Sequence, residues 1–139
     1  MLETLSKVYE IMIYTASKKE YAQEILKLID PNNKHISYML TREDCLLTKN
    51  GFFIKDLRII RRELSQVVII DNLVHSFGLQ LENGIPILDY EGEAGDEELF
   101  YLTEYLLNLS RSPDHEFVQT NKNYFKLQEI LEANLDGLQ

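Results

Sequence analysis

The chain has 139 residues, 45% of them hydrophobic, with 14 Lys and Arg against 23 Asp and Glu and a formal net charge of −9. This length allows one domain at most, and this share of apolar residues suffices for a globular core. The negative charge argues against a nucleic-acid binder, because phosphate contacts need a basic face, and equally against docking on an anionic membrane surface.

Two further classes are excluded by simple counts. The single cysteine, Cys45, rules out an internal disulfide and a multi-cysteine metal site. The longest stretch without an acidic or basic residue, 72–81, is far shorter than the roughly 20 apolar residues of a membrane span. The first residues, MLETLSKVYE, lack the basic-then-apolar order of a secretory signal. We therefore expect an intracellular protein, nuclear or cytoplasmic.

The first third of the chain predicts a strand, a helix and a second strand. Residues 9–14 (YEIMIY) form an apolar, partly β-branched run, typical of a strand buried on both faces. Residues 18–29 follow a helical pattern, with Ser17 and Glu20 at the spacing of a capping box. Its apolar stripe consists of Tyr21, Ala22, Ile25, Leu26, Leu28 and Ile29. Residues 35–40 (HISYML) are the second strand candidate.

The middle of the chain predicts a hairpin and two more strands. In residues 45–54, two apolar runs flank Asn50-Gly51, a strong hairpin signal. Residues 56–64 read as a short helix or turn, and residues 67–70 (VVII) as a strand. Residues 84–88 (GIPIL) are a further strand, placed at an edge or ending early because of Pro86.

The last part of the chain predicts an acidic loop and two helices. Residues 89–96 form the loop, residues 96–110 the first helix and residues 121–135 the second. The first helix places Leu99, Leu102, Leu106 and Leu109 on one face, and the second places Tyr124, Leu127, Leu131 and Leu135. Strands alternating with helices imply a mostly parallel α/β sheet. We expect residues 1–110 to form the domain and residues 111–139 a helical extension that packs back on it or serves a partner.

Polar side chains follow two of the predicted strands. Thr15 comes after the first strand, Asp71 and Asn72 come after VVII, and Lys55 follows the hairpin. Ligands of open parallel sheets bind beyond the carboxyl ends of the strands, where a hydroxyl, a lysine and an acid–amide pair suit phosphate and Mg²⁺. Each residue also has an ordinary interpretation, as a helix start, a solvated charge or a turn.

A resemblance organises these residues. The segments YEIMIYTASKKEYA, LTREDCLLTKNGFFIKDL, VVIIDN and DEELFYLTEYL resemble, in order, the small C-terminal-domain phosphatase family. This family is also called NLI-interacting-factor-like and belongs to the haloacid dehalogenase superfamily. The resemblance covers residues 8–109. It implies a Rossmann-like, mostly parallel sheet with flanking helices and a hairpin insertion, and hydrolysis of phosphoserine or phosphothreonine in phosphoproteins with Mg²⁺ and an aspartyl-phosphate.

The resemblance also implies a role for each residue that matches the family's motifs. Thr15 would hold a phosphoryl oxygen, and Lys55 would screen the charges of the aspartate and the phosphate. Asp71 and Asn72 would complete the Mg²⁺ shell, directly or through water. Arg42 would face the substrate phosphate.

One motif of the family is not found. The family's nucleophile is the first Asp of a D-x-D-x-T motif that ends its first strand, and its second Asp is the general acid. None of the eight aspartates here has another Asp two positions later: Asp30, Asp44, Asp56, Asp71, Asp89, Asp96, Asp114 and Asp136. With eight residues before Tyr9, we expect the first, central strand to be absent and the sequence to start within the domain. Without the attacking carboxylate we expect no catalysis.

The resemblance places the absent strand between YEIMIY and VVII, which leaves three structural alternatives. The two strands close up on each other, a partner or a second copy supplies a strand, or the chain folds poorly. Three functions stay open: a Mg²⁺-dependent protein phosphatase without its first strand, a non-catalytic pseudophosphatase that binds a phosphoprotein or another partner, or a fragment of a longer phosphatase. A family member in the mitochondrial import machinery shows that binding roles occur on this fold.

Overall fold

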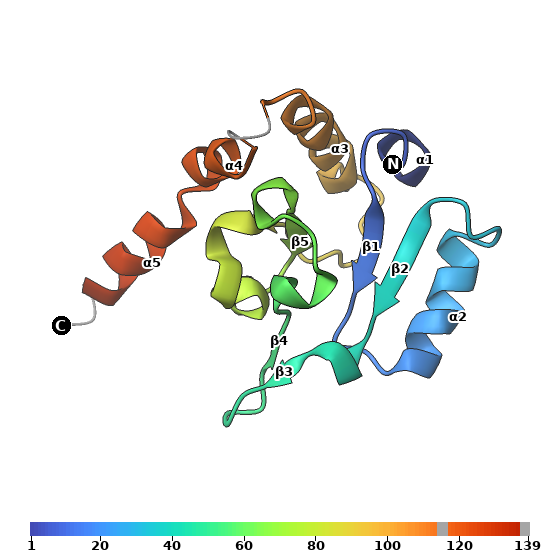
Figure 1. Cartoon of the computed structure of the whole chain (residues 1–139), viewed down its shortest axis with the longest axis horizontal. Coiled ribbons are helices and arrows are strands. Elements are labelled where there is room, and N and C mark those ends of the chain that lie inside the picture. The colour runs from blue at the N-terminus through green and yellow to red at the C-terminus, as the bar shows by residue number, and fades with distance from the viewer. Residues whose placement is uncertain (114–116, 137–139) are drawn as a thin grey trace.

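A computed structural model describes residues 1–113 and 117–136. After the short helix α1 (Leu2–Leu5), strand β1 (Ile11–Tyr14) pairs in parallel with β2 (Ile36–Leu40), and α2 (Lys19–Ile29) connects them (Figure 1). A parallel pair needs a crossover of this kind, because a tight turn reverses the chain and can join only antiparallel strands. The two predicted strands and the helix between them are confirmed.

Helix α2 differs from the prediction in its cap and its burial. Lys18 occupies the N-cap position and no side-chain cap hydrogen bond forms, so the capping box predicted at Ser17 is wrong. The backbone of Ser17 is used elsewhere: its N–H donates to Thr15 Oγ1 and its C=O accepts from the Arg42 N–H. Of the predicted apolar stripe only Ala22 is buried and Leu26 is half-buried.

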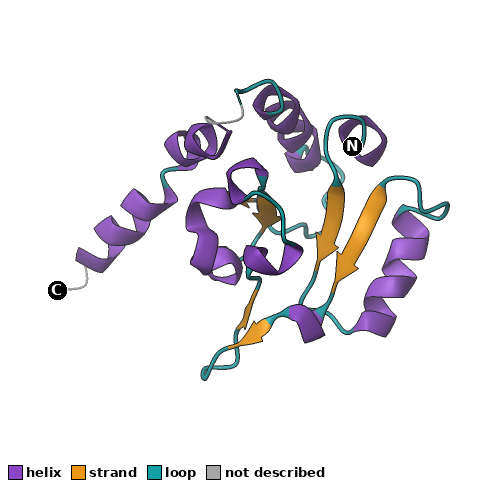
Figure 2. Ribbon diagram, viewed as in Figure 1, coloured by secondary structure: helices purple, strands orange, loops and turns teal. Residues whose placement is uncertain are grey.

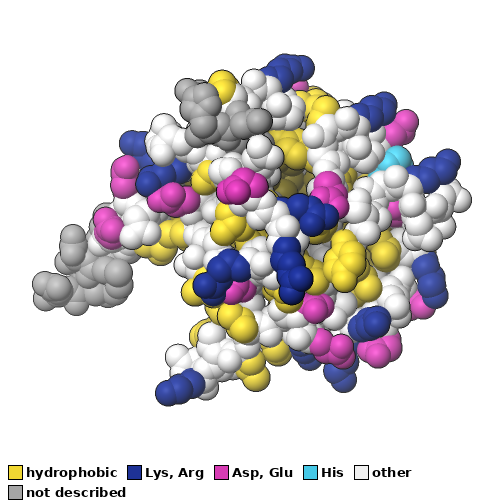
Figure 3. Space-filling model, viewed as in Figure 1, with side chains coloured by type: hydrophobic (Ala, Val, Ile, Leu, Met, Phe, Trp, Pro, Cys, Tyr) yellow, Lys and Arg dark blue, Asp and Glu magenta, His cyan; other side chains and the backbone are white. Residues whose placement is uncertain are grey.

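The hairpin is present as predicted and projects from the body of the molecule (Figure 2). Strands β3 (Leu46–Leu47) and β4 (Phe53–Ile54) are antiparallel, and the 3₁₀ turn η1 (Arg42–Asp44) precedes them. Gly51 in the connecting turn has a φ of 84°, a left-handed conformation that glycine adopts without strain. Leu46, Leu47 and Phe52 are exposed, and apolar surface covers much of this projection in Figure 3.

The second parallel pair consists of β5 (Ile69–Asp71) and β6 (Gly84–Pro86), which confirms strands in both predicted regions. The 3₁₀ segments η2 (Leu57–Ile60), η3 (Leu64–Gln66) and η4 (Val74–Asn83) surround it. Phe77, interrupting η4, is fully buried and clusters with Leu57 and Ile69. A Cβ atom at Gly84 would overlap the Phe77 ring, so this close packing requires glycine.

The parallel strands do not form the single sheet expected from the sequence. β1–β2 and β5–β6 are separate two-stranded sheets, and within the described ranges β1 and β5 are not hydrogen-bonded to each other. The alternative in which these two strands close up on each other is therefore wrong for this structure. What joins the two halves is a shared layer of apolar side chains.

That layer is the main core. Helix α3 (Glu98–Leu109) contributes three buried leucines, which meet Leu5 and Ile85. Ile11 of β1 and Ile70 of β5 pack against the same cluster. Leu99, predicted on the buried face of this helix, is 54% exposed, because α3 starts at Glu98 and its first turn extends beyond the core.

The C-terminal region forms two helices where the sequence predicted one. Helix α4 (Phe117–Phe125) and helix α5 (Leu127–Asp136) are separated by Lys126, whose φ of 50° cannot continue a right-handed helix. Tyr124 and Leu131 are exposed and not on a buried stripe, and the side chain of Leu135 lies outside the described residues. No helix within the described ranges is long and apolar enough to cross a membrane.

Helix α4 is fixed to the rest of the molecule by one buried amide. Asn121 Nδ2 donates to the C=O groups of Glu82 and Gly84 at 2.8 and 3.1 Å, and its Oδ1 accepts from the Tyr105 hydroxyl at 3.0 Å. Lys122 adds an exposed ion pair with Glu82. The start of the region predicted as an extension therefore contacts η4, β6 and α3, while the division at residue 110 stays a prediction.

Candidate functional site

A lysine and an aspartate lie together at the carboxyl end of β5. Lys55 directly follows β4 and Asp71 is the last residue of β5, and Lys55 Nζ forms an ion pair with Asp71 Oδ2. Their side chains are only 13% and 4% exposed. The other oxygen of Asp71 accepts from the Leu73 N–H at 2.8 Å, and the Lys55 N–H donates to the Ser76 C=O. Two residues predicted for the site thus form a largely buried, hydrogen-bonded unit.

Asn72 lies beside this pair but turns toward the acidic loop. Its Nδ2 donates to Asp89 Oδ1 at 2.5 Å, and the residue is exposed. An open hollow begins there, lined by Asn72, Ile87, Leu88, Asp89, Glu91, Glu93 and Asp96. The ring of carboxylates gives this side of the site a negative charge.

Arg42 contacts the loop that follows β1, which starts at Thr15. The Arg42 N–H donates to the Ser17 C=O, and Arg42 Nε donates to the Ala16 C=O at 2.7 Å. The Arg42 guanidinium lies 5.0 Å from the centre of the Phe53 ring, a cation–π distance. The loop after β1, η1 and the hairpin are therefore held together around one arginine that remains exposed.

Cys45 lies against the loop that follows β1. Its Sγ is 3.8 Å from the Thr15 C=O and 3.6 Å from the Thr41 C=O. Burial raises the pKa of the thiol, and the charges of Lys55 and Asp71 act on it in opposite directions. The thiol therefore contacts the backbone of Thr15 and is within range of the charges of the Lys55–Asp71 pair.

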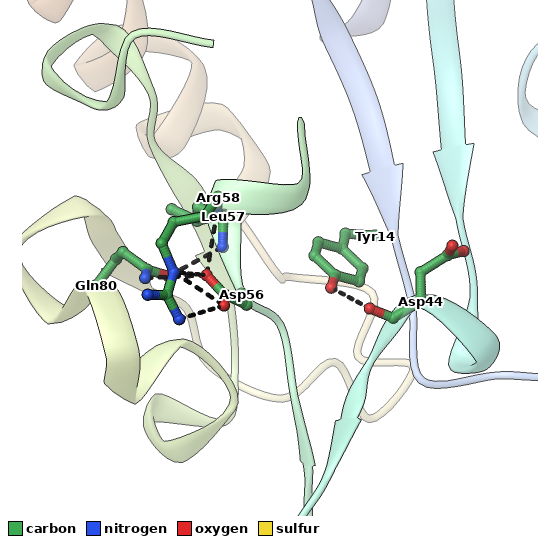
Figure 4. Close-up of polar contacts among 6 residues, drawn as sticks. All are labelled: Tyr14, Asp44, Asp56, Leu57, Arg58 and Gln80. Atoms are coloured by element: carbon green, nitrogen blue, oxygen red, sulfur yellow. Dashed lines mark hydrogen bonds and ion pairs between the residues drawn. The ribbon is translucent and has the colours of Figure 1, made fainter. Parts of the chain in front are cut away.

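Tyr14, which the sequence placed only in a strand, joins the two sides of the site. Its hydroxyl donates to the Asp44 C=O at 2.7 Å (Figure 4). Burial raises its pKa to about 12, the nearby Cys45 adds to this, and a backbone hydrogen bond from Asp56 acts the other way. A tyrosine at the end of an apolar strand carries no local signal of such a contact.

The segment after Lys55 is fixed by a second polar network. Asp56 accepts from Arg58 and, at 3.1 Å, from Gln80 Nε2, while Gln80 Oε1 accepts from the Leu57 N–H at 2.9 Å (Figure 4). The hydrogen bond from Arg58, together with those from the Arg58 backbone and Gln80, lowers the pKa of Asp56 despite its partial burial. This network restricts the backbone next to Lys55 and so orients its side chain. No local pattern in the sequence pointed to Gln80.

The oxygens present suit Mg²⁺ but are few. Carboxylate and amide oxygens are the ligands this ion prefers, in an octahedral shell. Both oxygens of Asp71 already accept hydrogen bonds, from Lys55 and Leu73. Within residues 1–113 and 117–136, no group of three or more His, Cys, Asp or Glu side chains is arranged to hold a metal ion. Asp71 and Asn72 thus offer part of a magnesium shell.

Comparison with known proteins assigns this chain to a family. The family model described as NLI interacting factor-like phosphatase matches residues 1–132. The chain is 44% identical over 131 residues to CTD small phosphatase-like protein 2 of Dictyostelium discoideum, covering 94% of this chain and 22% of that relative. It is 43% identical over 105 residues to CTD small phosphatase-like protein 3 of Caenorhabditis elegans, covering 76% and 36%. It is 35% identical over 126 residues to the mitochondrial import inner membrane translocase subunit TIM50 of Candida glabrata, covering 91% and 26%.

The fold resembles solved phosphatase structures as well. Fission yeast RNA polymerase II CTD phosphatase Fcp1-R271A, bound to beryllium fluoride, matches with a TM-score of 0.56 and 27% identity. That match covers 91% of this chain and 33% of the other. The chain therefore spans about a fifth to a third of the length of the relatives it matches, between 22% and 36%.

Proposed function

Because this chain belongs to the NLI interacting factor-like phosphatase family, we propose that it supplies the phosphate- and Mg²⁺-binding part of a protein serine/threonine phosphatase site. The observation that carries the proposal is the largely buried Lys55–Asp71 pair at the carboxyl end of β5. A phosphorylated side chain of a protein is the expected substrate.

The residues around the pair have roles that their contacts support. Thr15 Oγ1 accepts from the Ser17 N–H, which leaves its own hydrogen to donate to a phosphoryl oxygen. Lys55 neutralises charge on the phosphate and on carboxylates next to it. Arg42, held by the Ala16 C=O and the Phe53 ring, keeps an exposed guanidinium for the substrate phosphate.

Asp71 and Asn72 would hold Mg²⁺ through their side-chain oxygens. The bound ion would polarise the phosphoryl group and offset the negative charge that develops on it. Water, the phosphate or a further carboxylate has to complete the shell, since two residues cannot fill it.

We expect this chain on its own to give no phosphatase turnover. The sequence holds no D-x-D-x-T motif, so the attacking carboxylate and the general acid must come from elsewhere. The first, central strand of the family's sheet is, in this proposal, the part that this chain does not supply. The test is hydrolysis of an aryl phosphate and a phosphoserine peptide, with and without Mg²⁺. Mg²⁺-dependent turnover that disappears in Asp71→Ala would contradict the prediction.

Adding a peptide that carries a D-x-D-x-T strand separates this proposal from its alternative. Turnover only with that peptide supports a phosphatase that takes its nucleophile from another segment, whether a second polypeptide or the rest of a longer phosphatase. If the folded protein binds phosphate but shows no turnover with the peptide, the second candidate is favoured. That candidate is a non-catalytic phosphoprotein- or partner-binding protein, and the relatives named TIM50 favour it. A location in the nucleus or cytoplasm stays a prediction.

A further inference from the structure

The open hollow beside Asn72 has no part in the roles proposed so far. Its volume is about 500 Å³, within the range of about 300–1,000 Å³ that is typical of ligand pockets. Of the residues that line it, none is basic and four are acidic, namely Asp89, Glu91, Glu93 and Asp96. None of these four forms an ion pair with a lysine or arginine among the described residues. We call this feature the acidic hollow, and its negative charge is not balanced from within the described chain.

The acidic hollow adjoins the proposed phosphate site. Asn72 directly follows Asp71, so their Cα atoms are about 3.8 Å apart. Asn72 Nδ2 donates to Asp89 Oδ1 at 2.5 Å, which places the Asp89 carboxylate within one side-chain length of the backbone next to Asp71. An extended segment advances about 3.3–3.6 Å per residue. A residue one to three positions from a phosphorylated residue can therefore reach the hollow.

One wall of the acidic hollow is apolar. Ile87 and Leu88 line it, and Leu88 is 71% exposed although it lies only two residues beyond β6. Lysine and arginine side chains bury their methylene stems along apolar surface and keep their charged heads in a polar environment. An apolar wall beside a group of carboxylates therefore suits both parts of a long basic side chain.

A metal ion suits the acidic hollow less well than a basic side chain does. Mg²⁺ needs an octahedral shell of oxygens at about 2.0–2.1 Å. In the part of the chain that the structure describes, no three His, Cys, Asp or Glu side chains are arranged in this way. One oxygen each of Asp89 and Asp96 already accepts a hydrogen bond, from Asn72 and from the Glu98 N–H. A basic side chain needs no such convergence, because one or two carboxylates can pair with it.

We propose that the acidic hollow binds a lysine or arginine of the phosphoprotein substrate, one to three residues from the phosphorylated serine or threonine. The inference rests on the proposed function, because it names the class of segment that the same site takes. Arg42 and Lys55 then lie on the phosphate side of the site. Asp89, Glu91 and Glu93 lie on the side of the basic residue. Complementary charges of this kind fix the orientation of a bound segment and disfavour segments with acidic residues at those positions.

The experiment is an NMR titration of the full chain, without Mg²⁺, with three peptides of equal length. The first carries a phosphoserine with a lysine two positions before and after it, and the second has alanines in place of the lysines. The third keeps the lysines and has an unphosphorylated serine. Shifts of the backbone amides of residues 87–93 report binding in the acidic hollow, and those of Arg42 and Lys55 report binding of the phosphate.

We expect the lysine phosphopeptide to bind about fivefold more tightly than the alanine phosphopeptide at low ionic strength, since pairs of exposed charges are individually weak. The preference should decrease in about 0.5 M salt, because salt screens exposed charges. The alanine phosphopeptide should shift the amides of Arg42 and Lys55 and leave those of residues 87–93 almost unchanged.

A matched pair of double variants tests whether the hollow causes the preference. Glu91→Gln with Glu93→Gln removes two charges from the acidic hollow. Glu129→Gln with Glu132→Gln removes the same charge from α5, outside the hollow. All four residues are exposed, so neither double variant should lose its fold. We expect the first to reduce the preference for the lysine phosphopeptide to about twofold or less and the second to leave it unchanged.

The outcomes separate this inference from the proposed function. Phosphate-dependent binding with equal affinity for the lysine and alanine phosphopeptides overturns the inference and leaves the proposed function standing. A lysine preference that survives Glu91→Gln with Glu93→Gln also overturns the inference. Equal binding of the two lysine peptides, lost in that double variant, keeps the hollow as a site for basic residues and overturns the proposed phosphate site. No shift with any peptide at millimolar concentration overturns both.

Discussion

The two parallel pairs of strands differ in how completely they are enclosed. Around β5 and β6, Phe77 and Ile85 are at most 2% exposed and Asn121 is 1% exposed. In the β1–β2 half, every residue of β1 is only half-buried, and Leu28 of α2 is 77% exposed. Because stabilisation follows the apolar area removed from water, the β5–β6 half should carry most of the free energy of folding, and the β1–β2 half should be held chiefly through the shared core.

The sharpest test of this comparison is a matched pair of core truncations. Phe77→Ala should lower the free energy of unfolding by about 3–5 kcal/mol, because a fully buried ring leaves a cavity. Leu28→Ala, on the exposed face of α2, should change it by less than about 0.5 kcal/mol. Urea denaturation followed by circular dichroism measures both.

Gly84→Ala provides a second route if Phe77→Ala does not fold well enough to measure. A methyl group at Gly84 would overlap the Phe77 ring, so this small change should also destabilise the protein. Similar losses of unfolding free energy for Leu28→Ala and Phe77→Ala would show that the two halves contribute equally to stability, contrary to the difference described above.

The next largest effect is expected from breaking a buried ion pair, compared with an exposed pair of the same lysine–carboxylate chemistry. Lys55→Met leaves Asp71 charged and almost fully buried, which should cost about 3–5 kcal/mol of unfolding free energy. Lys122→Met removes the pair with Glu82, whose side chains are 44% and 49% exposed, and should cost less than about 1 kcal/mol. Chemical denaturation at pH 7 compares the two variants. Equal costs would mean that Asp71 is reached by water and is not the buried group described above.

A smaller loss is expected where α4 joins the β5–β6 half. Asn121→Ala removes the donor for the C=O groups of Glu82 and Gly84 and the acceptor of the Tyr105 hydroxyl. Buried groups left without partners should lower the unfolding free energy by about 1–3 kcal/mol. Asn123→Ala, an exposed residue of the same helix, is the control and should stay within about 0.5 kcal/mol of the parent. If both variants behave alike, α4 is not fixed by Asn121.

Local patterns predicted the elements well because each strand, the hairpin and α3 has its own apolar periodicity or turn residues. The arrangement of the strands was not predictable, since the pattern does not say which strand pairs with which. The break at Lys126 was missed because only its backbone angle ends the helix. The contacts of Asn121 join residues 16 to 39 positions apart and leave no mark in the surrounding sequence.

In the candidate site, too, local patterns predicted some residues and missed others. Strand ends pointed to Thr15, Asp71 and Asn72, and the structure joins Lys55 to Asp71 and places Thr15 beside Cys45. Asn72 lies beside that pair, but its side-chain amide donates to Asp89 of the acidic loop. Tyr14 and Gln80 were missed because their role depends on partners 23 to 30 residues away.

The smallest effect is expected in the β1–β2 half and concerns the N-cap of α2, for which the sequence-based prediction was wrong. Lys18 is the N-cap of α2 and makes no side-chain cap hydrogen bond. Lys18→Asp should raise the unfolding free energy by about 0.5–1 kcal/mol, because a carboxylate there accepts from the free N–H groups of the first turn and favours the helix dipole. Ser17→Ala should change it by less than about 0.5 kcal/mol, since the contacts of Ser17 are made by its backbone. Thermal unfolding measures both variants. A clear loss of stability in Ser17→Ala with no gain in Lys18→Asp would show that the side chain of Ser17 caps the helix after all.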